Sequence, residues 1–306
     1  MPTWNEILAE TGVTPGPIDL VRRKYLSRLH GLTGRNVILY YSGWMQRQDG
    51  SVHSIIHDGD INAFMTVIHG LDVAKGLDLV LHTPGGEIAA VEGIVSYLRK
   101  KFGMDIRCFV PQAAFSGGTM IACACREIYM GRHSSIGPID PQFGPSAAYA
   151  VLDEFSRAAA EIKVRPETIP LWQAIFSKIP VGFLTECQQA VALSSELAQH
   201  WLETGMFAGQ PGAARKAKEI VAHLNNHADT KTHSRHIDAE QARGFGLNIL
   251  DLETAVGSDG KTSIQDAVLT VHHACINTFF QAPKLYKIIE NQNGVGMFIS
   301  GSSPTS

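Results

Sequence analysis

The chain has 306 residues, of which 44% are hydrophobic, and its 26 Lys and Arg against 29 Asp and Glu give a net charge of −3. These proportions are typical of a globular enzyme with a full core, and they exclude a disordered or fibrous chain. Because the charges are nearly balanced, we expect no nucleic-acid partner.

The first residues predict a cytoplasmic protein. Glu6 and Glu10 stand where a secretory signal would have basic residues and then an apolar run. The apolar runs 37–41 and 77–81 are far shorter than the roughly 20 residues that cross a bilayer, so we expect buried strands and no membrane span. Residues 1–34 are predicted to be an N-terminal helical segment whose basic amphipathic helix packs on the core or on a neighbouring subunit.

Short β-rich runs alternate with helical stretches from residue 36 to about 131. This alternation predicts crossover βα units with mainly parallel strands. Beyond residue 147, apolar residues recur every three or four positions, which predicts helices over 147–162, 180–207, 212–227 and 265–280. The apolar part of the last helix, Val268 to Phe280, is expected to pack between subunits. The small, polar residues 291–306 are predicted to be a flexible tail.

The five cysteines fit a reducing compartment. They lie in apolar segments and lack the spacing of a disulfide framework or a zinc site. They are Cys108, Cys123, Cys125, Cys187 and Cys275.

A glycine turn follows the apolar strand 77–82. Thr83, Pro84, Gly85 and Gly86 come directly before a predicted helix. The two glycines leave backbone N–H groups unobstructed, and such donors can face an oxyanion. Because Pro-Gly-Gly also makes ordinary strand-to-helix turns, the motif alone leaves both interpretations open.

A serine occupies the corresponding place after the next predicted strand. Residues 106–110 lead to Ser116, which precedes Gly117, Gly118 and an apolar helix. A nucleophile needs such an exposed hydroxyl at a helix start. The alternative interpretation is a simple N-cap serine, which is common.

The two turns are more informative together. They follow neighbouring parallel strands, so both are expected at the same edge of the sheet. The N–H groups of Gly86 and Gly117 then converge beside Ser116, which is the geometry that acyl transfer requires. We expect Gly85 to contact the substrate.

Three motifs establish a family resemblance: TPGG before a helix, AAFSGG about thirty residues later, and SSIGPIDPQ at 134–142. They resemble the Clp protease proteolytic subunit and, more closely, the signal peptide peptidase A family. With the segments THSRHI and LTVHHA, the chain resembles the serine dehydrogenase proteinase family over roughly residues 35–290. The resemblance implies an α/β fold of the Clp protease and crotonase type, a spiral of ββα units with a helical C-terminal part. It also implies a peptidase domain over 35–290, an oxyanion hole of Gly86 and Gly117, and a homo-oligomer.

The resemblance also indicates which residue is the base. Ile139 stands where the Clp subunit has its catalytic histidine, and His133 lies a few residues too early. The signal peptide peptidase A family uses a lysine some fifty to sixty residues beyond the serine. Lys178, 62 residues beyond Ser116, is the favoured base, and Lys163 is its competitor.

A lysine can activate a serine only as the neutral amine, so apolar groups must bury it. The side chains expected to do so around Lys178 are Phe176, Ile179, Val181 and Phe183.

Metal and cofactor sites are not expected. His233 and His236 are three residues apart and His272 precedes His273, but no further ligand stands at a recognised spacing. No GxGxxG motif follows a strand, so no nicotinamide cofactor is predicted. Asp140 is assigned a structural role.

The leading hypothesis is a serine endopeptidase that forms an acyl-enzyme through a Ser116–Lys178 dyad and acts on a peptide or protein substrate. The first alternative is a crotonase-like enzyme acting on acyl-coenzyme A, with Glu87 as its base. The second is a non-catalytic scaffold of the same fold.

Overall fold

A seven-stranded sheet forms the centre of the molecule, with the strand order β11-β10-β1-β2-β3-β5-β9. The computed structural model describes residues 6, 9–10, 19–47, 51–144, 146–225 and 235–301. The strands are β1 (Asn36–Ser42), β2 (Leu77–His82), β3 (Ile106–Val110), β5 (Glu127–Met130), β9 (Ile249–Asp251), β10 (Leu285–Asn291) and β11 (Gly296–Ser300). Strands β1, β2, β3, β5 and β9 pair in parallel, while β10 and β11 pair antiparallel at one edge. The predicted mixed α/β fold with mainly parallel strands is confirmed.

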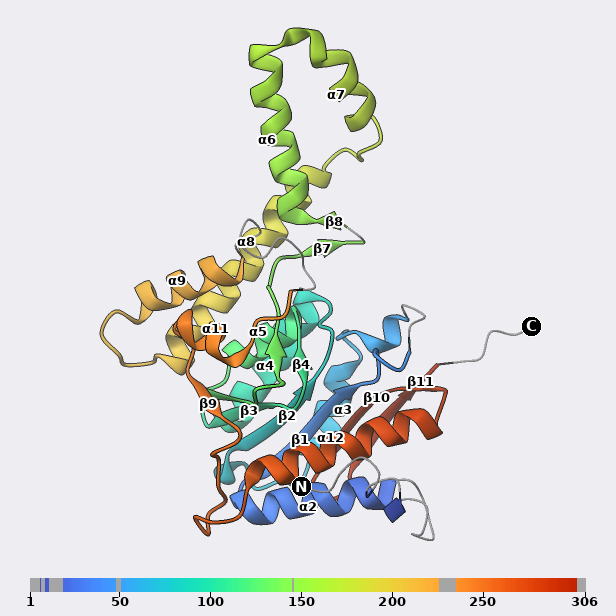
Figure 1. Ribbon diagram of the computed structural model, residues 1–306, viewed down its shortest axis with the longest axis vertical. Coiled ribbons are helices and arrows are strands. Elements are labelled where there is room, and N and C mark those ends of the chain that lie inside the picture. Colours follow the sequence, from blue (N-terminus) through green and yellow to red (C-terminus); the bar gives the residue numbers. More distant parts are fainter. Residues whose placement is uncertain are drawn as a thin grey trace, which may run out of the picture.

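Helices cover both faces of this sheet (Figure 1). The crossovers are α3 (Asp60–Ile68), α4 (Ile88–Phe102) and α5 (Gly117–Cys123). They pack into the larger core, with α4 supplying Val91, Ile94 and Leu98 at helical spacing. On the other face, α2 (Asp19–Thr33) and α12 (Ile264–Gln281) pack side by side over a second core.

Helix α12 differs from its expected role between subunits. Of its apolar stretch, Val268, Val271, Cys275 and Phe279 are fully buried within the chain, while Phe280 at its end is exposed. The buried residues face the sheet and α2, so the apolar periodicity reports the chain's own core.

The predicted flexible tail is wrong for residues 291–300. Strand β11 pairs with β10 through Met297, Phe298 and Ile299. An Asn-Gly pair at 293–294 with Gly294 at φ 76° makes the hairpin turn between them. An Asn-Gly pair between apolar runs is a strong hairpin signal, and it was readable in the sequence.

An arm of helices projects from the body (Figure 1). It consists of α6 (Ala148–Val164), α7 (Ile169–Phe176) and the first part of α8 (Phe183–Trp201), which returns to the body. Beyond α8, a π-helical turn (Leu202–Met206), α9 (Ala213–Leu224) and α11 (Ala239–Gly244) pack beside the sheet. Short 3-10 helices occupy Val52–Ser54, Val73–Lys75 and Pro166–Thr168.

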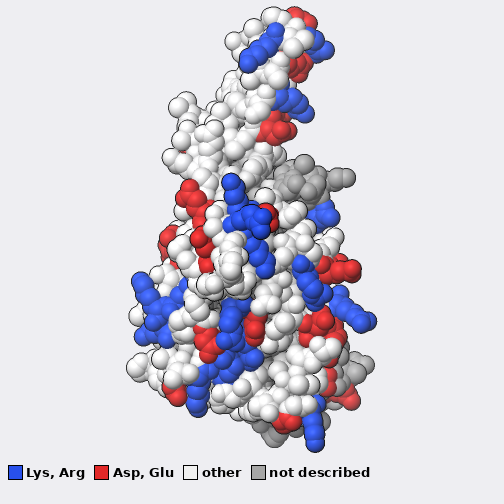
Figure 2. All heavy atoms as spheres, turned by 90° about the vertical axis from the view of Figure 1, so that its left-hand side faces the viewer, with Lys and Arg blue, Asp and Glu red and all other residues white. Residues whose placement is uncertain are grey.

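Figure 2 shows Lys and Arg interspersed with Asp and Glu, and much of the arm uncharged in that view.

Two small sheets lie outside the central one. Strand β4 (Ala113–Ala114) pairs in parallel with β6 (Ser135–Ile136), beside the carboxyl ends of β2 and β3. Strand β7 (Gln142–Phe143) pairs antiparallel with β8 (Ser146–Ala147) at the base of the arm.

Two neutral histidines are buried within the body. Burial lowers the pKa of His82 well below its usual value. Burial, with repulsion from His273 and His133, lowers the pKa of His272 to about 3. The Tyr41 hydroxyl lies 2.7 Å from His272 Nδ1. Both imidazoles must take up a proton when the chain unfolds in acid.

We therefore expect the free energy of unfolding to fall with acidification. A histidine whose folded pKa is lowered contributes stability above the unfolded value near 6.5, and that contribution falls as the pH drops toward 3. Each such histidine contributes a slope of about 1.4 kcal/mol per pH unit. Urea unfolding between pH 7.5 and 4.5 measures how steeply the free energy of unfolding changes with pH. That dependence should be shallower in His272→Asn than in the wild type. It should be unchanged in His69→Asn, whose side chain is exposed. Equal slopes in wild type and His272→Asn would contradict the prediction.

Candidate active site

Ser116 occupies a strained backbone position at the start of α5. Its φ of 50° and ψ of −114° make it the one non-glycine residue with positive φ among those the structure describes. Such a conformation costs on the order of 1–3 kcal/mol, and outliers of this kind cluster at functional sites. The Ser116 side chain forms no capping bond to the helix. The geometry therefore does not support the simple N-cap interpretation, and it resembles the sharp turn that exposes a nucleophile.

The glycine turn after β2 lies directly against Ser116. Gly85 has φ 101°, and a Cβ there would lie 2.7 Å from Phe115 O and from Ser116 Cβ. A Cβ on Gly86 would lie 2.2 Å from Ile56 O, and one on Gly117 would lie 3.3 Å from Gly86 N. The structure thus brings Gly85, Gly86, Ser116 and Gly117 together, and only glycine fits at 85 and 86.

Two backbone amides beside Ser116 are available. Their neighbours are occupied: Gly85 N–H donates to Thr83 Oγ1, Glu87 N–H to Ile56 O and Gly118 N–H to Phe115 O. Within the described ranges, no hydrogen bond from Gly86 N–H or Gly117 N–H is found. Two free donors next to a serine hydroxyl are what a tetrahedral oxyanion requires.

Backbone pairing holds the two turns together. Thr83 N–H donates to Ala113 O at 3.1 Å, and Phe115 N–H donates to Thr83 O at 3.0 Å. Ala113 N–H donates to His82 Nδ1 at 3.3 Å, so the neutral imidazole joins the pairing. On the far side, Thr119 Oγ1 lies 2.9 Å from Ala114 O. Sequence reasoning missed His82 and Thr119, although both stand within three residues of the turns.

The segment after β5 holds no catalytic base at the expected place. Ile139 is 2% exposed and packs in the larger core. Asp140 is buried and accepts a hydrogen bond from Gln142 Nε2 at 2.8 Å, which fits its structural assignment. His133 is exposed in the turn that Ser134 N–H closes onto Gly131 O.

Both candidate lysines lie on the arm. Lys163 is in the last turn of α6 and Lys178 follows α7, and both side chains are exposed. The arm stands away from α5, which lies in the body (Figure 1). The described contacts of the single chain do not join either lysine to Ser116.

The apolar surroundings expected for Lys178 do not form within one chain. Val181 is 106% exposed, and Phe176, Ile179 and Phe183 are only half-buried. Within α7, Trp172 is the buried residue, and Lys178 beyond the end of that helix is exposed.

The remaining histidine candidates are described in part. His233 lies outside the described residues. His236 Nδ1 lies 2.8 Å from Ser135 Oγ, and the centroids of the His236 and Phe115 rings are 4.9 Å apart in a T-shaped arrangement. In the part of the chain that the structure describes, no group of three or more His, Cys, Asp or Glu is arranged to hold a metal ion.

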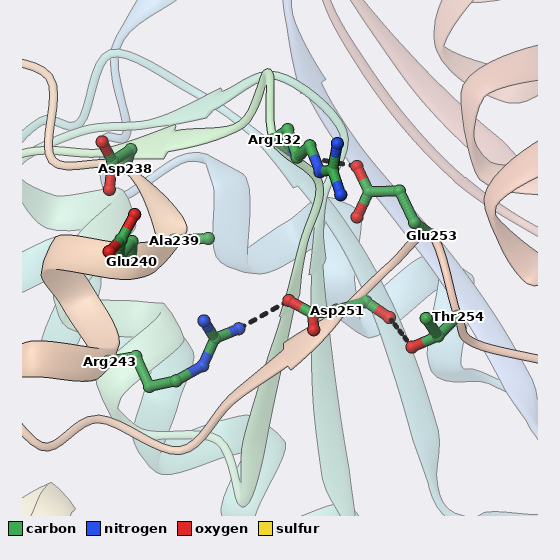
Figure 3. Close-up of a pocket in the computed structure, with 8 residues that line it drawn as sticks. All are labelled: Arg132, Asp238, Ala239, Glu240, Arg243, Asp251, Glu253 and Thr254. Carbon is green, nitrogen blue, oxygen red and sulfur yellow. Dashed lines mark hydrogen bonds and ion pairs between the residues drawn. The ribbon is translucent and has the colours of Figure 1, made fainter.

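A polar pocket of about 420 Å³ lies near the carboxyl ends of β5 and β9 (Figure 3). Arg243 Nη2 is 2.6 Å from Asp251, and Arg132 N–H donates to Glu253 at 2.8 Å. Its lining contains none of the predicted site residues; it is Arg132, Asp238, Ala239, Glu240, Arg243, Asp251, Glu253 and Thr254.

Comparisons with known proteins indicate the family of this chain. Residues 51–188, which include both glycine turns, Ser116 and both lysines, match the family model of ClpP-like SDH-type serine proteinases. The uncharacterized protein MJ0137 of Methanocaldococcus jannaschii is 31% identical over 240 residues, 76% of this chain and 74% of that protein. The uncharacterized protein MJ1495 of the same organism is 39% identical over 95 residues, 31% of this chain and 32% of that protein.

Proposed function

The chain belongs to the ClpP-like SDH-type serine proteinase family, and from that premise we propose that it is a serine endopeptidase with Ser116 as its nucleophile. Ser116 Oγ attacks the peptide carbonyl carbon while a base takes the hydroxyl proton. The N–H groups of Gly86 and Gly117 bind the resulting oxyanion, and Gly85 contacts the substrate. The proton passes to the leaving amine, and water then hydrolyses the acyl-enzyme.

One observation carries this proposal most strongly. Ser116 is held at positive φ against the Gly85–Gly86 turn, beside two amides without a described acceptor. A purely structural serine would gain nothing from that strain, whereas a nucleophile gains a hydroxyl held next to its oxyanion donors.

The base is proposed to be Lys178, with Lys163 as the alternative. Because both amines are exposed in a single chain, each needs a second surface to bury it and to bring it to a serine. The arm offers such a surface, since Val164, Leu171 and Val181 are 81%, 61% and 106% exposed. We therefore link the dyad to assembly, in which a neighbouring copy covers the arm.

A homo-oligomer is the expected state in solution. Light scattering at micromolar concentration should give a multiple of the 33.2 kDa chain mass. Leu171→Asp with Val181→Asp should lower the assembled mass, because the arm then carries charges where it must be covered. The matched control Val52→Asp, whose side chain is 65% exposed but lies off the arm, should leave the mass unchanged. A 33.2 kDa monomer in the wild type would overturn the expectation.

A covalent probe tests the activity itself. Wild-type protein should be labelled by a fluorophosphonate, mass spectrometry should map the adduct to Ser116, and the protein should hydrolyse a quenched-fluorescent peptide library. Glu87, the base of the acyl-coenzyme A alternative, is exposed at the start of α4. Turnover of acyl-coenzyme A without peptide hydrolysis or labelling would favour that alternative.

Our proposal also covers the type of α/β fold and the cellular location of the protein. We propose that the βα crossovers and the small β4–β6 sheet form a ββα spiral of the Clp protease type; the parallel order of β1, β2, β3 and β5 supports this. Each described helix is too short or too polar to cross a bilayer. All five cysteines are buried free thiols, which fits the proposed cytoplasmic location. The proposed reaction needs no cofactor.

A further inference from the structure

A buried ion pair lies behind the glycine turn and takes no part in the proposed chemistry. Lys287 on β10 and Asp60 at the start of α3 are both 0% exposed. Lys287 Nζ donates to the two Asp60 carboxylate oxygens at 2.8 and 2.7 Å and to Ile55 O at 2.7 Å. These three bonds use every proton of the ammonium group.

Stability alone is a weak reason for such a pair. Removing two charges from water costs several kcal/mol per ion, and well-packed apolar residues can often replace a buried pair without loss. The pair's other bonds indicate what it does. Asp60 Oδ2 also accepts the Tyr40 hydroxyl at 2.7 Å and the His57 N–H at 3.2 Å. The pair therefore fixes the backbone on both sides of Ile56.

Ile56 connects this pair to the candidate oxyanion hole. Its N–H donates to Gly85 O at 2.8 Å, and its carbonyl accepts the Glu87 N–H at 2.9 Å. Gly86, between those two residues, packs directly on the Ile56 backbone. One further bond holds the segment, from Ser42 Oγ to Ser54 O at 2.7 Å. A shift of Ile56 would therefore move Gly86 N–H relative to Ser116.

We propose that Lys287 and Asp60 are positioning residues that hold Ile56, and through it Gly86 N–H, in place for the oxyanion. The inference rests on the proposed peptidase function. An oxyanion donor stabilises the transition state only where its N–H points at the developing charge, so a small displacement is costly. Lys287 is not the base, because its protons are committed to Asp60 and Ile55 O.

Labelling kinetics test the proposal. Lys287→Met should lower the second-order rate of fluorophosphonate labelling about 10- to 100-fold, less than loss of a whole donor. The final labelled fraction and the shape of the pH profile should not change, and kcat should fall with little change in KM. A merely structural role would instead lower the labelled fraction. The matched control is Arg22→Met, which removes another fully buried cation, paired with Glu290 at 2.8 Å, and should change the rate less than about threefold.

A second variant and a second measurement cover the case in which Lys287→Met does not fold. Asp60→Asn with Lys287→Met removes both charges, and it should fold yet show the same loss of rate. Hydrogen exchange should be at least about tenfold faster at Glu87 N–H in either variant and unchanged at Phe115 N–H, which bonds to Thr83 O.

Hydrogen exchange and fluorophosphonate labelling together distinguish failure of the positioning role from failure of the peptidase function. Unchanged exchange at Glu87 together with an unchanged labelling rate would overturn the positioning role. A wild type that resists labelling would overturn the peptidase function, while the exchange at Glu87 would still decide whether the pair holds the turn.

Discussion

Ser116→Ala is expected to abolish fluorophosphonate labelling and to lower peptide hydrolysis by about 10⁴-fold or more, while the chain keeps its fold. The size of the loss follows from removing a nucleophile whose partners act as one unit with it. The fold survives because the Ser116 side chain forms no capping bond to α5. Labelling, peptide hydrolysis and circular dichroism of the purified variant measure the three parts of this result.

Ser135→Ala is the control for this first prediction. Ser135 is buried on the neighbouring strand β6 and lies 2.8 Å from His236 Nδ1, which makes it the described serine that most resembles a nucleophile with a base. This variant should label like the wild type. Undiminished labelling in Ser116→Ala, with loss in Ser135→Ala, would transfer the role to Ser135.

Lys178→Ala is expected to lower turnover by about 10³-fold or more and to leave the assembled mass of the wild type unchanged. The base must take the proton of Ser116, and its removal leaves the oxyanion donors to supply weak residual turnover. Steady-state kinetics and light scattering of the purified variant measure both effects.

Lys163→Ala is the matched control, since it removes an exposed lysine from the same arm. The turnover of Lys163→Ala should be less than about threefold below that of the wild type. A near-normal rate in Lys178→Ala beside an inactive Lys163→Ala would make Lys163 the base. Loss only in His133→Ala would restore a histidine mechanism.

The sequence was most informative where the signal was local. Thr83 to Gly86 and Ser116 to Gly118 each follow an apolar strand and precede a helix, so their positions at one sheet edge could be predicted from neighbouring residues alone. The structure brings these turns into contact. Their catalytic roles stay predictions.

Long-range pairing lay outside that reasoning. Lys287 reaches Asp60 because β10 pairs with β1, and no local pattern around residue 287 indicates a partner 227 residues away. The arm was missed for a related reason. Apolar periodicity predicted α6 and α8 but not α7 (Ile169–Phe176), and periodicity does not show whether a helix returns to the core. Lys178 was therefore expected in apolar surroundings, whereas its side chain is exposed.

The strain at Ser116 also has an evolutionary consequence. A glycine at this position would adopt φ 50° without steric cost, so a single substitution would relieve an energy on the order of 1–3 kcal/mol and remove the hydroxyl together. Selection for stability alone would therefore favour the inactive glycine form. In descendants that are no longer selected for catalysis, we expect residue 116 to be substituted before the Gly85–Gly86 turn changes.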